Sequence, residues 1–372
     1  MTDGVGKRFV DVSGTAPDDP EAWEPLVFTA AEIDDEIERL ASLPAPADGR
    51  RESLFVHPRS TTPGLGLAPG IRVALCVLKP GEATRPRRQN STIVGFCIRG
   101  RGAAIVGGER IEVGQYDAWN LPSYRTGWHV NEGDDLHVRL EYSNAPVLEK
   151  LHVHLVEPQP PEEPSRRDER EDTSGEDHHD DVADDPRRQS PYGTFELNDS
   201  GASLMPYERL INPPAVMSHA LHWPWADVRA HLDKLVALGP DYVGRRLYLL
   251  YNPMTGRTNG TTPSFFATIT IRPPGIVDRP HRHVSAAINY FFEGSGWSRI
   301  AGQKYTWGAG DLMLTAPGWA IHHHASDDAP VYELTVQDQP FHIGLESLLW
   351  QEDLRRPPVL LGAQPGFSTN RV

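Results

Sequence analysis

The sequence of 372 residues predicts an all-β protein with two barrel or jelly-roll domains, and two observations carry that prediction. The segment Arg87–Gly102 runs parallel to His281–Gly296 at a constant offset of 194 residues, and both are short apolar strands that end in Gly-x-Gly. Downstream, GGERIEVGQYDAWNLPSY in the first half is matched by AGQKYTWGAGDLMLTAPGW in the second. Short strands separated by Gly and Pro at regular spacing are typical of barrels and sandwiches.

An acidic tract separates the two halves. From Glu157 to Arg188 the chain carries thirteen Asp or Glu against five Arg, with almost no apolar residue and many prolines. Such a segment cannot bury enough surface to offset the entropy of ordering, so we expect a disordered linker. The predicted division is residues 1–50, an N-terminal arm and helix; 51–156, the first barrel; 157–193, the linker; 194–245, an inter-barrel segment with a helix; 246–345, the second barrel; and 346–372, a C-terminal tail.

Two helices are predicted, one ahead of each barrel. Thr29 and Glu32 form a capping box, which starts a helix that runs to about Leu43. The second helix ends before Gly239, and its apolar residues fall at helical spacing, at Trp225, Val228, Leu232 and Leu235. Both helices are expected to pack on a core rather than to hold a cofactor.

Composition excludes several classes of partner. A net charge of −15 argues against nucleic acid, because phosphate binding needs clustered Lys and Arg. No stretch approaches the ~20 apolar residues of a membrane helix, and the N-terminus does not resemble a signal peptide. The two cysteines, Cys76 and Cys97, are expected to be free buried thiols in a reducing cytoplasm.

A His-x-His pair is the strongest sign of a metal site. Residues i and i+2 of a strand point to one face, so His281 and His283 aim together while the residue between them points away. A chain with sixteen histidines forms such pairs by chance, and His152 with His154 is interpreted as one beside the linker. The alternative for His281 and His283 is a pair of core histidines without metal.

A third ligand must come from a facing strand. The run Gly-Asp-Leu-Met-Leu-Thr-Ala-Pro-Gly-Trp-Ala-Ile before His322 supplies it, and His322 lies 39 residues beyond His283. Strand parity places His322 and His324 on one face and His323 on the other. One extra residue in the Gly-Asp to Pro run leaves open whether His322 or His323 is the ligand.

These motifs resemble a known family. Gly-x5-His-x-His and Gly-Asp…Pro-x4-His are the two cupin motifs, and residues from about Ile211 to Pro340 resemble the gentisate 1,2-dioxygenase group of bicupins. That group includes enzymes that open salicylates and hydroxynaphthoates, and the likeness is weaker over residues 60–156. The resemblance implies two double-stranded β-helix barrels, Fe(II), O₂, an aromatic acid as substrate and a homo-oligomer, either a dimer or a tetramer. It also implies ring cleavage between the carbons that bear carboxylate and hydroxyl.

The chain departs from the family in its first barrel. Well-known members carry a metal triad there, whereas this sequence has Arg87 and Gln89 at the His-x-His positions and Gly127 or Trp128 at the third. None of these side chains forms an ordinary ligand set. We therefore expect one Fe(II) per chain, bound in the second barrel by the triad His281, His283 and His322.

Four further residues are candidates for contact with the substrate. His324 is placed to take the substrate hydroxyl proton, or alternatively to orient a ligand by a hydrogen bond. Asn289 stands where several family enzymes have an Arg that pairs with the substrate carboxylate. Arg299 could replace that arginine, and Trp319 could stack on the ring; the alternatives are an exposed strand arginine and barrel packing.

The predicted function is an Fe(II)-dependent, extradiol-type dioxygenase that opens gentisate or a substituted salicylate. One alternative is a cupin metalloenzyme that uses another metal to isomerise its substrate or to cleave a diketone. The other is a non-catalytic bicupin that binds a small ligand. The sequence leaves open the ring substituents and the residue that holds the substrate carboxylate.

Overall fold

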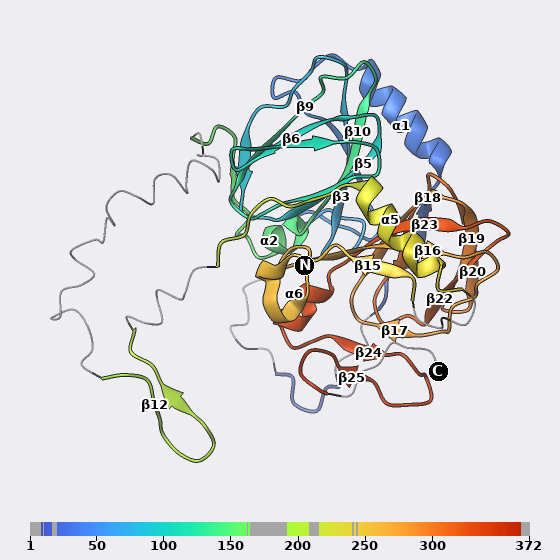
Figure 1. Ribbon diagram of the computed structural model, residues 1–372. Coiled ribbons are helices and arrows are strands. Elements are labelled where there is room, and N and C mark those ends of the chain that lie inside the picture. Colours follow the sequence, from blue (N-terminus) through green and yellow to red (C-terminus); the bar gives the residue numbers. More distant parts are fainter. Residues whose placement is uncertain are drawn as a thin grey trace, which may run out of the picture.

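The computed structural model describes residues 9, 11–16, 21–161, 163, 192–207, 216–239, 242 and 245–365. The chain forms two β-barrels that lie against each other, with the first half of the sequence in one and the second half in the other (Figure 1). Most of the predicted linker, residues 164–191, lies outside the described residues, so its predicted disorder stays a prediction.

The first barrel is built from two sheets. The six-stranded sheet has the order β14 (His222–Trp223), β8 (Ala118–Leu121), β5 (Ile93–Arg99), β10 (His137–Ser143), β3 (Arg72–Leu78) and β2 (Arg51–Phe55). The five-stranded sheet has the order β11 (Val156–Glu157), β4 (Arg87–Gln89), β9 (Thr126–Val130), β6 (Gly102–Val106) and β7 (Glu109–Val113).

The second barrel repeats this plan with three sheets. Its six-stranded sheet has the order β1 (Leu26–Phe28), β21 (Leu312–Ala316), β18 (Ala287–Glu293), β23 (Val331–Gln337), β16 (Phe266–Arg272) and β15 (Leu247–Leu249). The facing strands are β20 (Gln303–Gly308), β19 (Ser295–Ile300) and β22 (His322–Ser326), with β17 (Arg282–His283), β24 (Leu349–Gln351) and β25 (Val359–Leu360) beside them. A separate hairpin joins β12 (Phe195–Glu196) to β13 (Ser203–Leu204).

Three strand pairings cross the boundaries expected from the sequence. Strand β1 of the N-terminal arm pairs with β21 of the second barrel, and the backbone N–H of Ala30 donates to Asp311 Oδ1 at 2.7 Å. Strand β14 of the inter-barrel segment pairs with β8 of the first barrel. In the C-terminal tail, β24 pairs with β17, the strand that carries His283. Each outlying segment is therefore part of a barrel.

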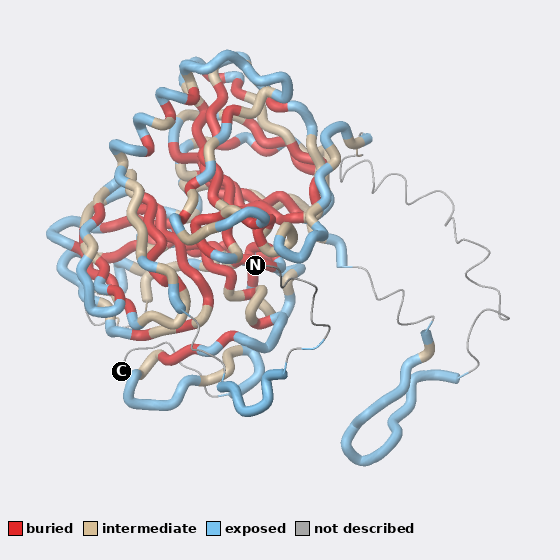
Figure 2. The backbone as a smooth tube through the Cα atoms, turned by 180° about the vertical axis from the view of Figure 1, so that it is seen from behind, coloured by how far each residue is buried: buried red, intermediate tan, exposed pale blue. Residues whose placement is uncertain are grey.

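The six-stranded sheets of the two barrels pack face to face and share one core. Alternation along β18 shows how: Ile288, Tyr290 and Phe292 join the shared core, while Ala287 and Asn289 line the interior of the second barrel. Across the interface, the rings of Phe96 and Phe292 lie 5.6 Å apart. Figure 2 shows this buried layer in red between the two barrels. One face of each sheet thus stabilises the pair, and the other face is left for a site.

Both predicted helices are confirmed. Helix α1 (Ala30–Ser42) begins at the capping box of Thr29 and Glu32 and buries Ile33, Ile37 and Leu40. Helix α5 (Trp225–Val236) buries Leu232 against the shared core and is followed by Gly239, whose φ is 77°. Within the described residues, the remaining helices are α2 (Ala145–Lys150), α6 (Gln339–Gly344) and the 3-10 helix η2 (Pro253–Thr258).

Cys76 and Cys97 are buried free thiols, as predicted. Within the described part of the chain, no helix is both long and apolar enough to cross a membrane. The cytoplasmic location and the homo-oligomer stay predictions.

Candidate metal centre and acid pocket

Three buried histidines come together where β17 meets β22. An isolated bridge joins His281 to His322, with backbone N···O distances of 3.1 and 2.9 Å, and His283 follows two residues after His281 on the same face. One potential ligand atom from each of the three side chains lies within 4.8 Å of the other two. The structure therefore brings together the three residues predicted as ligands, in a geometry that one ion can bridge.

Backbone carbonyls orient all three rings in the same way. The Nδ1 atom lies 3.0 Å from Arg279 O in His281, 2.8 Å from Ser285 O in His283, and 2.9 Å from Ala320 O in His322. Because a carbonyl oxygen only accepts, each Nδ1 carries the proton and each Nε2 is left with its lone pair. This arrangement is the outer support that metal-binding imidazoles use.

Burial also keeps the three rings neutral. Loss of solvent, with smaller contributions from His322 and Arg245, holds the pKa of His281 and His283 well below the ordinary histidine range. Burial likewise lowers the pKa of His322 to about 4. Neutral imidazoles do not need to lose a proton before they bind a cation, so the donor set fits a divalent metal at neutral pH.

The triplet His322 to His324 follows strand parity. His322 and His324 are buried and both line the pocket, whereas His323 is half-exposed and pairs across the sheet with Arg299. Ser298 Oγ lies 2.8 Å from His324 Nδ1 and accepts the indole N–H of Trp307 at 2.9 Å. The extra residue before Pro317 has therefore not exchanged the two faces of the strand.

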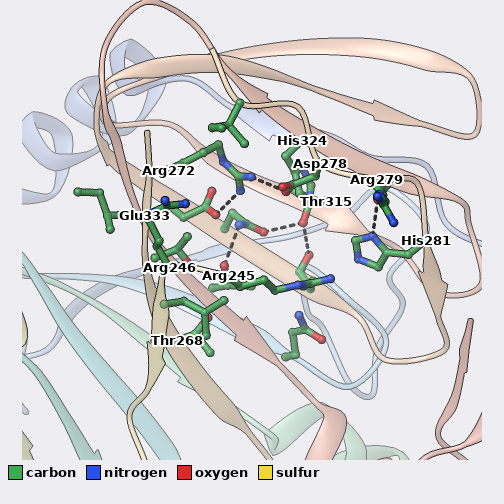
Figure 3. Close-up of a pocket in the computed structure, with 18 of the residues that line it drawn as sticks. Arg245, Arg246, Thr268, Arg272, Asp278, Arg279, His281, Thr315, His324 and Glu333 are labelled. Carbon is green, nitrogen blue, oxygen red and sulfur yellow. Dashed lines mark hydrogen bonds and ion pairs between the residues drawn. The ribbon is translucent and has the colours of Figure 1, made fainter. Parts of the chain in front are cut away.

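A pocket of about 1140 Å³ opens beside the triad. Its walls come from the interior faces of β16, β18 and β23, and its lining includes the three histidines together with His324 (Figure 3). Four arginines and two carboxylates contribute to the lining: Arg245, Arg246, Arg272, Arg279, Asp278 and Glu333. Positive charge in a concave site of this kind favours an anionic ligand.

One of these arginines is neutralised by the protein itself. Arg272 is buried and forms ion pairs with Asp278 and with Glu333, the latter at 2.6 Å. Figure 3 shows the three side chains together, close to His324. Burial is the largest influence on the pKa of His324, and Arg272 is the next; both lower it, so this ring is also neutral.

Three residues beside the triad were not predicted from the sequence: Arg245, Trp350 and Glu352. The ring of Trp350 stacks on His283, with centroids 4.5 Å apart, and its indole N–H donates to Glu352 at 3.0 Å. Arg245 donates to the same carboxylate at 3.0 Å, while its Nε is buried without a hydrogen-bond partner. No sequence motif predicts these contacts, because Arg245 and Glu352 are 107 residues apart and Trp350 lies in the tail, far along the chain from His283.

The three residues predicted to bind substrate have different positions. Asn289 lines the pocket, where it donates to Thr335 Oγ1 at 2.8 Å and accepts from Thr315 Oγ1 at 2.6 Å. Arg299 is exposed and donates to Gly302 O, and Trp319 lies under the guanidinium of Arg282. Neither Arg299 nor Trp319 lines the pocket, because both lie outside the barrel interior.

In the first barrel the corresponding pairing joins Arg87 to Gly127. This register assigns the third-ligand position to Gly127 rather than to Trp128. Among the described residues, the only metal-like cluster of three or more His, Cys, Asp or Glu is the triad of the second barrel.

Comparisons with known proteins agree with this architecture. The family model of the AraC-like ligand binding domain matches residues 266–363, within the second half of the chain. The 5-aminosalicylate 1,2-dioxygenase of a Comamonas species is 25% identical over 73% of this chain and 66% of its own length. The gentisate 1,2-dioxygenase of a Ralstonia species is 29% identical over 39% of this chain and 42% of its own. The chain thus matches less than two thirds of the length of each relative.

Among solved structures, the salicylate 1,2-dioxygenase of Pseudaminobacter salicylatoxidans superimposes with a TM-score of 0.70. The match covers 93% of this chain and 94% of that one, at 16% identity. Such a match shows the fold, and the predicted all-β bicupin is confirmed. The resemblance to gentisate 1,2-dioxygenase-like bicupins is likewise confirmed, because relatives in sequence and in structure carry names from that group.

Proposed function

We propose that this chain is an Fe(II)-dependent, extradiol-type dioxygenase that opens the ring of a salicylate-like acid. Oxygen would be inserted between the carbon that bears the carboxyl group and the carbon that bears the hydroxyl group. The observation that carries the proposal is the neutral triad His281, His283 and His322, placed at the wall of an arginine-lined pocket. Relatives named for 5-aminosalicylate and gentisate support the same substrate class.

The donor set suits ferrous iron. Three neutral imidazoles leave a divalent ion with its full charge and with open coordination positions for a chelating dianion and oxygen. When bound, ferrous iron supplies the electron-transfer chemistry that allows dioxygen to react with an aromatic ring. The chain's own task is to orient the three rings, which the carbonyls of Arg279, Ser285 and Ala320 do.

Arg245 is the residue we assign to the substrate carboxylate. It lines the same pocket as the three triad histidines. Figure 3 shows its side chain extending across the pocket toward His281. Glu352 holds one end of the guanidinium, and the buried Nε still needs an acceptor. A carboxylate satisfies that need with a charge-assisted hydrogen bond.

His324 is the proposed acceptor of the substrate hydroxyl proton. It shares the face of His322 and is neutral, and Ser298 fixes its ring through Nδ1. Its Nε2 is then the atom that faces the pocket. Removal of the phenolic proton lets the substrate approach the triad as a chelating dianion, and a positioned base of this kind contributes ~10²–10⁴-fold to a rate.

Oxygen uptake by the iron-loaded protein tests the proposal. Purified protein is loaded anaerobically with Fe(II), and gentisate, salicylate, nitrosalicylates, hydroxynaphthoates and catechols are then screened in an oxygen electrode and by absorbance. One O₂ consumed per acid opened is the expected result. Arg245→Gln should raise KM for the accepted acid by more than tenfold, whereas the matched Arg299→Gln, outside the pocket, should not. Turnover with manganese, nickel or zinc but without oxygen uptake would favour an isomerase, and ligand binding without turnover would favour a non-catalytic bicupin.

A further inference from the structure

A second arginine of the pocket has no anionic partner. Nη2 of Arg246 donates to the carbonyls of Gly239 and Tyr242 at 2.7 and 3.2 Å, and its guanidinium lies 5.3 Å from the centre of the Tyr242 ring. Within the described part of the chain, no carboxylate lies within ion-pair distance of it. Its Nε is buried and has no hydrogen-bond partner. A buried N–H of a cation that donates to nothing is costly, so an acceptor supplied by a ligand would be favourable.

Two of the other three arginines of the pocket already have carboxylate partners. Arg272 is paired with Asp278 and Glu333, and Arg245 is paired with Glu352 and proposed above to hold the substrate carboxylate. Unlike these two, Arg246 has no carboxylate partner among the described residues, so its charge is available to a further anionic group. The neutral contacts it makes, two carbonyls and an aromatic ring, fix the position of its guanidinium without reducing its charge.

Arg246 also lies on the side of the pocket that is remote from the triad. In Figure 3 it lies beside Glu333 and Thr268, His281 lies on the opposite side, and the side chain of Arg245 extends between them. A substrate whose carboxylate meets Arg245 would then point its far ring edge toward Arg246. The volume of about 1140 Å³ exceeds the ~300–1,000 Å³ of ordinary ligand pockets, so a substituent can be accommodated there.

From these contacts we infer that the substrate carries a second anionic group on its ring, which Arg246 binds at the end of the pocket remote from the metal. The inference rests on the proposed function and narrows its substrate class to salicylate-like acids with an additional carboxylate or comparable acidic substituent. Arg246 is a specificity-determining residue in this scheme, and Arg245 serves every acid of the class.

Calorimetric binding to the iron-loaded protein under anaerobic conditions tests the inference without turnover. Three probes are compared: salicylate, 5-carboxysalicylate and 5-carbamoylsalicylate. The carbamoyl group of the third probe has the shape of the carboxylate but no charge. 4-Carboxysalicylate and 4-carbamoylsalicylate are compared in the same way, in case the ring binds with position 4 rather than position 5 toward Arg246. For the wild-type protein we expect a carboxylate at one of these positions to tighten binding by about tenfold or more over the matched amide.

In Arg246→Gln the carboxylate and the matched amide should bind with about equal affinity. Arg246→Lys should retain part of the preference for carboxylate because the charge is kept. Arg245→Gln should weaken all probes in parallel and leave the advantage intact. Metal content and the circular dichroism spectrum establish that each variant is folded. The inference is overturned if the wild-type protein does not prefer the carboxylate at either position, if Arg246→Gln preserves the preference, or if no probe binds. A protein that shows the preference but consumes no oxygen would refute the proposed function alone.

Discussion

The two barrels share a scaffold, yet only one of them keeps the ligands. Ser285 and Ser91 are equivalent at the offset of 194, and both contact the residue two positions earlier. Ser285 Oγ lies 3.0 Å from His283 Nδ1, and Ser91 Oγ accepts from Gln89 Nε2 at 2.7 Å. The support for the second ligand is therefore present in both halves, although the first half has an amide in place of the imidazole.

The third-ligand position differs in space as well as in residue type. A Cβ added at Gly127 would lie 3.0 Å from the side chain of Leu121, so a larger residue at this position would crowd Leu121. Nearby, the first barrel buries the ion pair of Arg139 and Glu141, joined at 2.7 Å. The first barrel therefore differs from the second in the packing around the third-ligand position as well as in the ligand residues themselves.

The largest expected effect is loss of the metal from the second barrel. His322→Ala removes one of three protein ligands, so bound iron should fall from about one per chain to nearly none. His323→Ala is the matched control, because His323 lies on the other face of β22, and it should retain iron. Elemental analysis after gel filtration measures both variants. If His323→Ala lost the metal and His322→Ala kept it, the assignment of faces would be wrong.

The next effect concerns the stability of the first barrel. Glu141→Gln leaves the buried charge of Arg139 without its partner, and breaking such a pair costs ~3–5 kcal/mol of unfolding free energy. Chemical denaturation should show this loss, while iron per folded chain stays unchanged. Glu112→Gln, which breaks the exposed contact with Arg110, is the control and should change stability by less than ~1 kcal/mol. Equal losses in the two variants would contradict the burial argument.

A smaller effect separates chemistry from metal binding. His324→Ala should keep iron, because His324 is not one of the triad, but should slow turnover by roughly 10²-fold or more if it accepts the proton. Steady-state oxygen uptake measures kcat, and elemental analysis measures the metal. Loss of iron in this variant would instead assign His324 a role in supporting His322.

Acid should weaken the first barrel over a defined range of pH. Burial lowers the pKa of His137 to about 3, below the ordinary value of 6.5. As pH falls below about 6.5, the unfolded chain binds a proton at His137 and the folded chain does not, so the free energy of unfolding decreases until about pH 3. His137→Gln removes this contribution. The pH dependence of the denaturation midpoint between 4 and 6.5 should therefore be shallower in the variant, and an unchanged slope would contradict it.

The smallest expected effect is the most direct test of the comparison between barrels. Replacing Arg87, Gln89 and Gly127 with histidine restores the ligand types, but the Cβ of the third histidine would already press against Leu121 at 3.0 Å. The triple variant should therefore still bind about one iron per chain. Adding Leu121→Ala opens the space, and a second equivalent of metal appearing only then would confirm that cavity filling matters. A second equivalent in the triple variant alone would refute it.

Local patterns carried much of this structure. The repeat predicted two barrels, the capping box predicted α1, and strand parity predicted which histidines of β17 and β22 are buried together. The capping box and strand parity depend on residues within a few positions of one another, and the repeat is found by comparing two such short patterns. The register between distant strands was not available from such signals, so the choice between Gly127 and Trp128 needed the pairing of β4 with β9.

The arginine-lined pocket beside the triad was harder to predict, because residues from distant segments of the chain meet there. Arg245, Arg246 and Trp350 reach the site from segments before and after the barrel, and their partners lie up to 107 residues away. The exposed position of Arg299 follows from its alternation along β19, which places it opposite His323 rather than the triad. Parity applied to that strand could have excluded it, but the faces of β19 were not assigned from the sequence.

The strand β1 has a consequence for the order in which the chain can fold during synthesis. Its partner β21 is translated about 280 residues after it, as the separation of Ala30 from Asp311 indicates. At ~5–20 residues per second, this strand waits roughly a quarter of a minute to a minute for its partner. During that time its apolar residues Leu26 and Phe28 depend on α1 and the nascent first barrel, or on a chaperone, for cover. The first barrel waits only for β14, which is translated before β15 and the later strands of the second barrel, so the first barrel can be completed first.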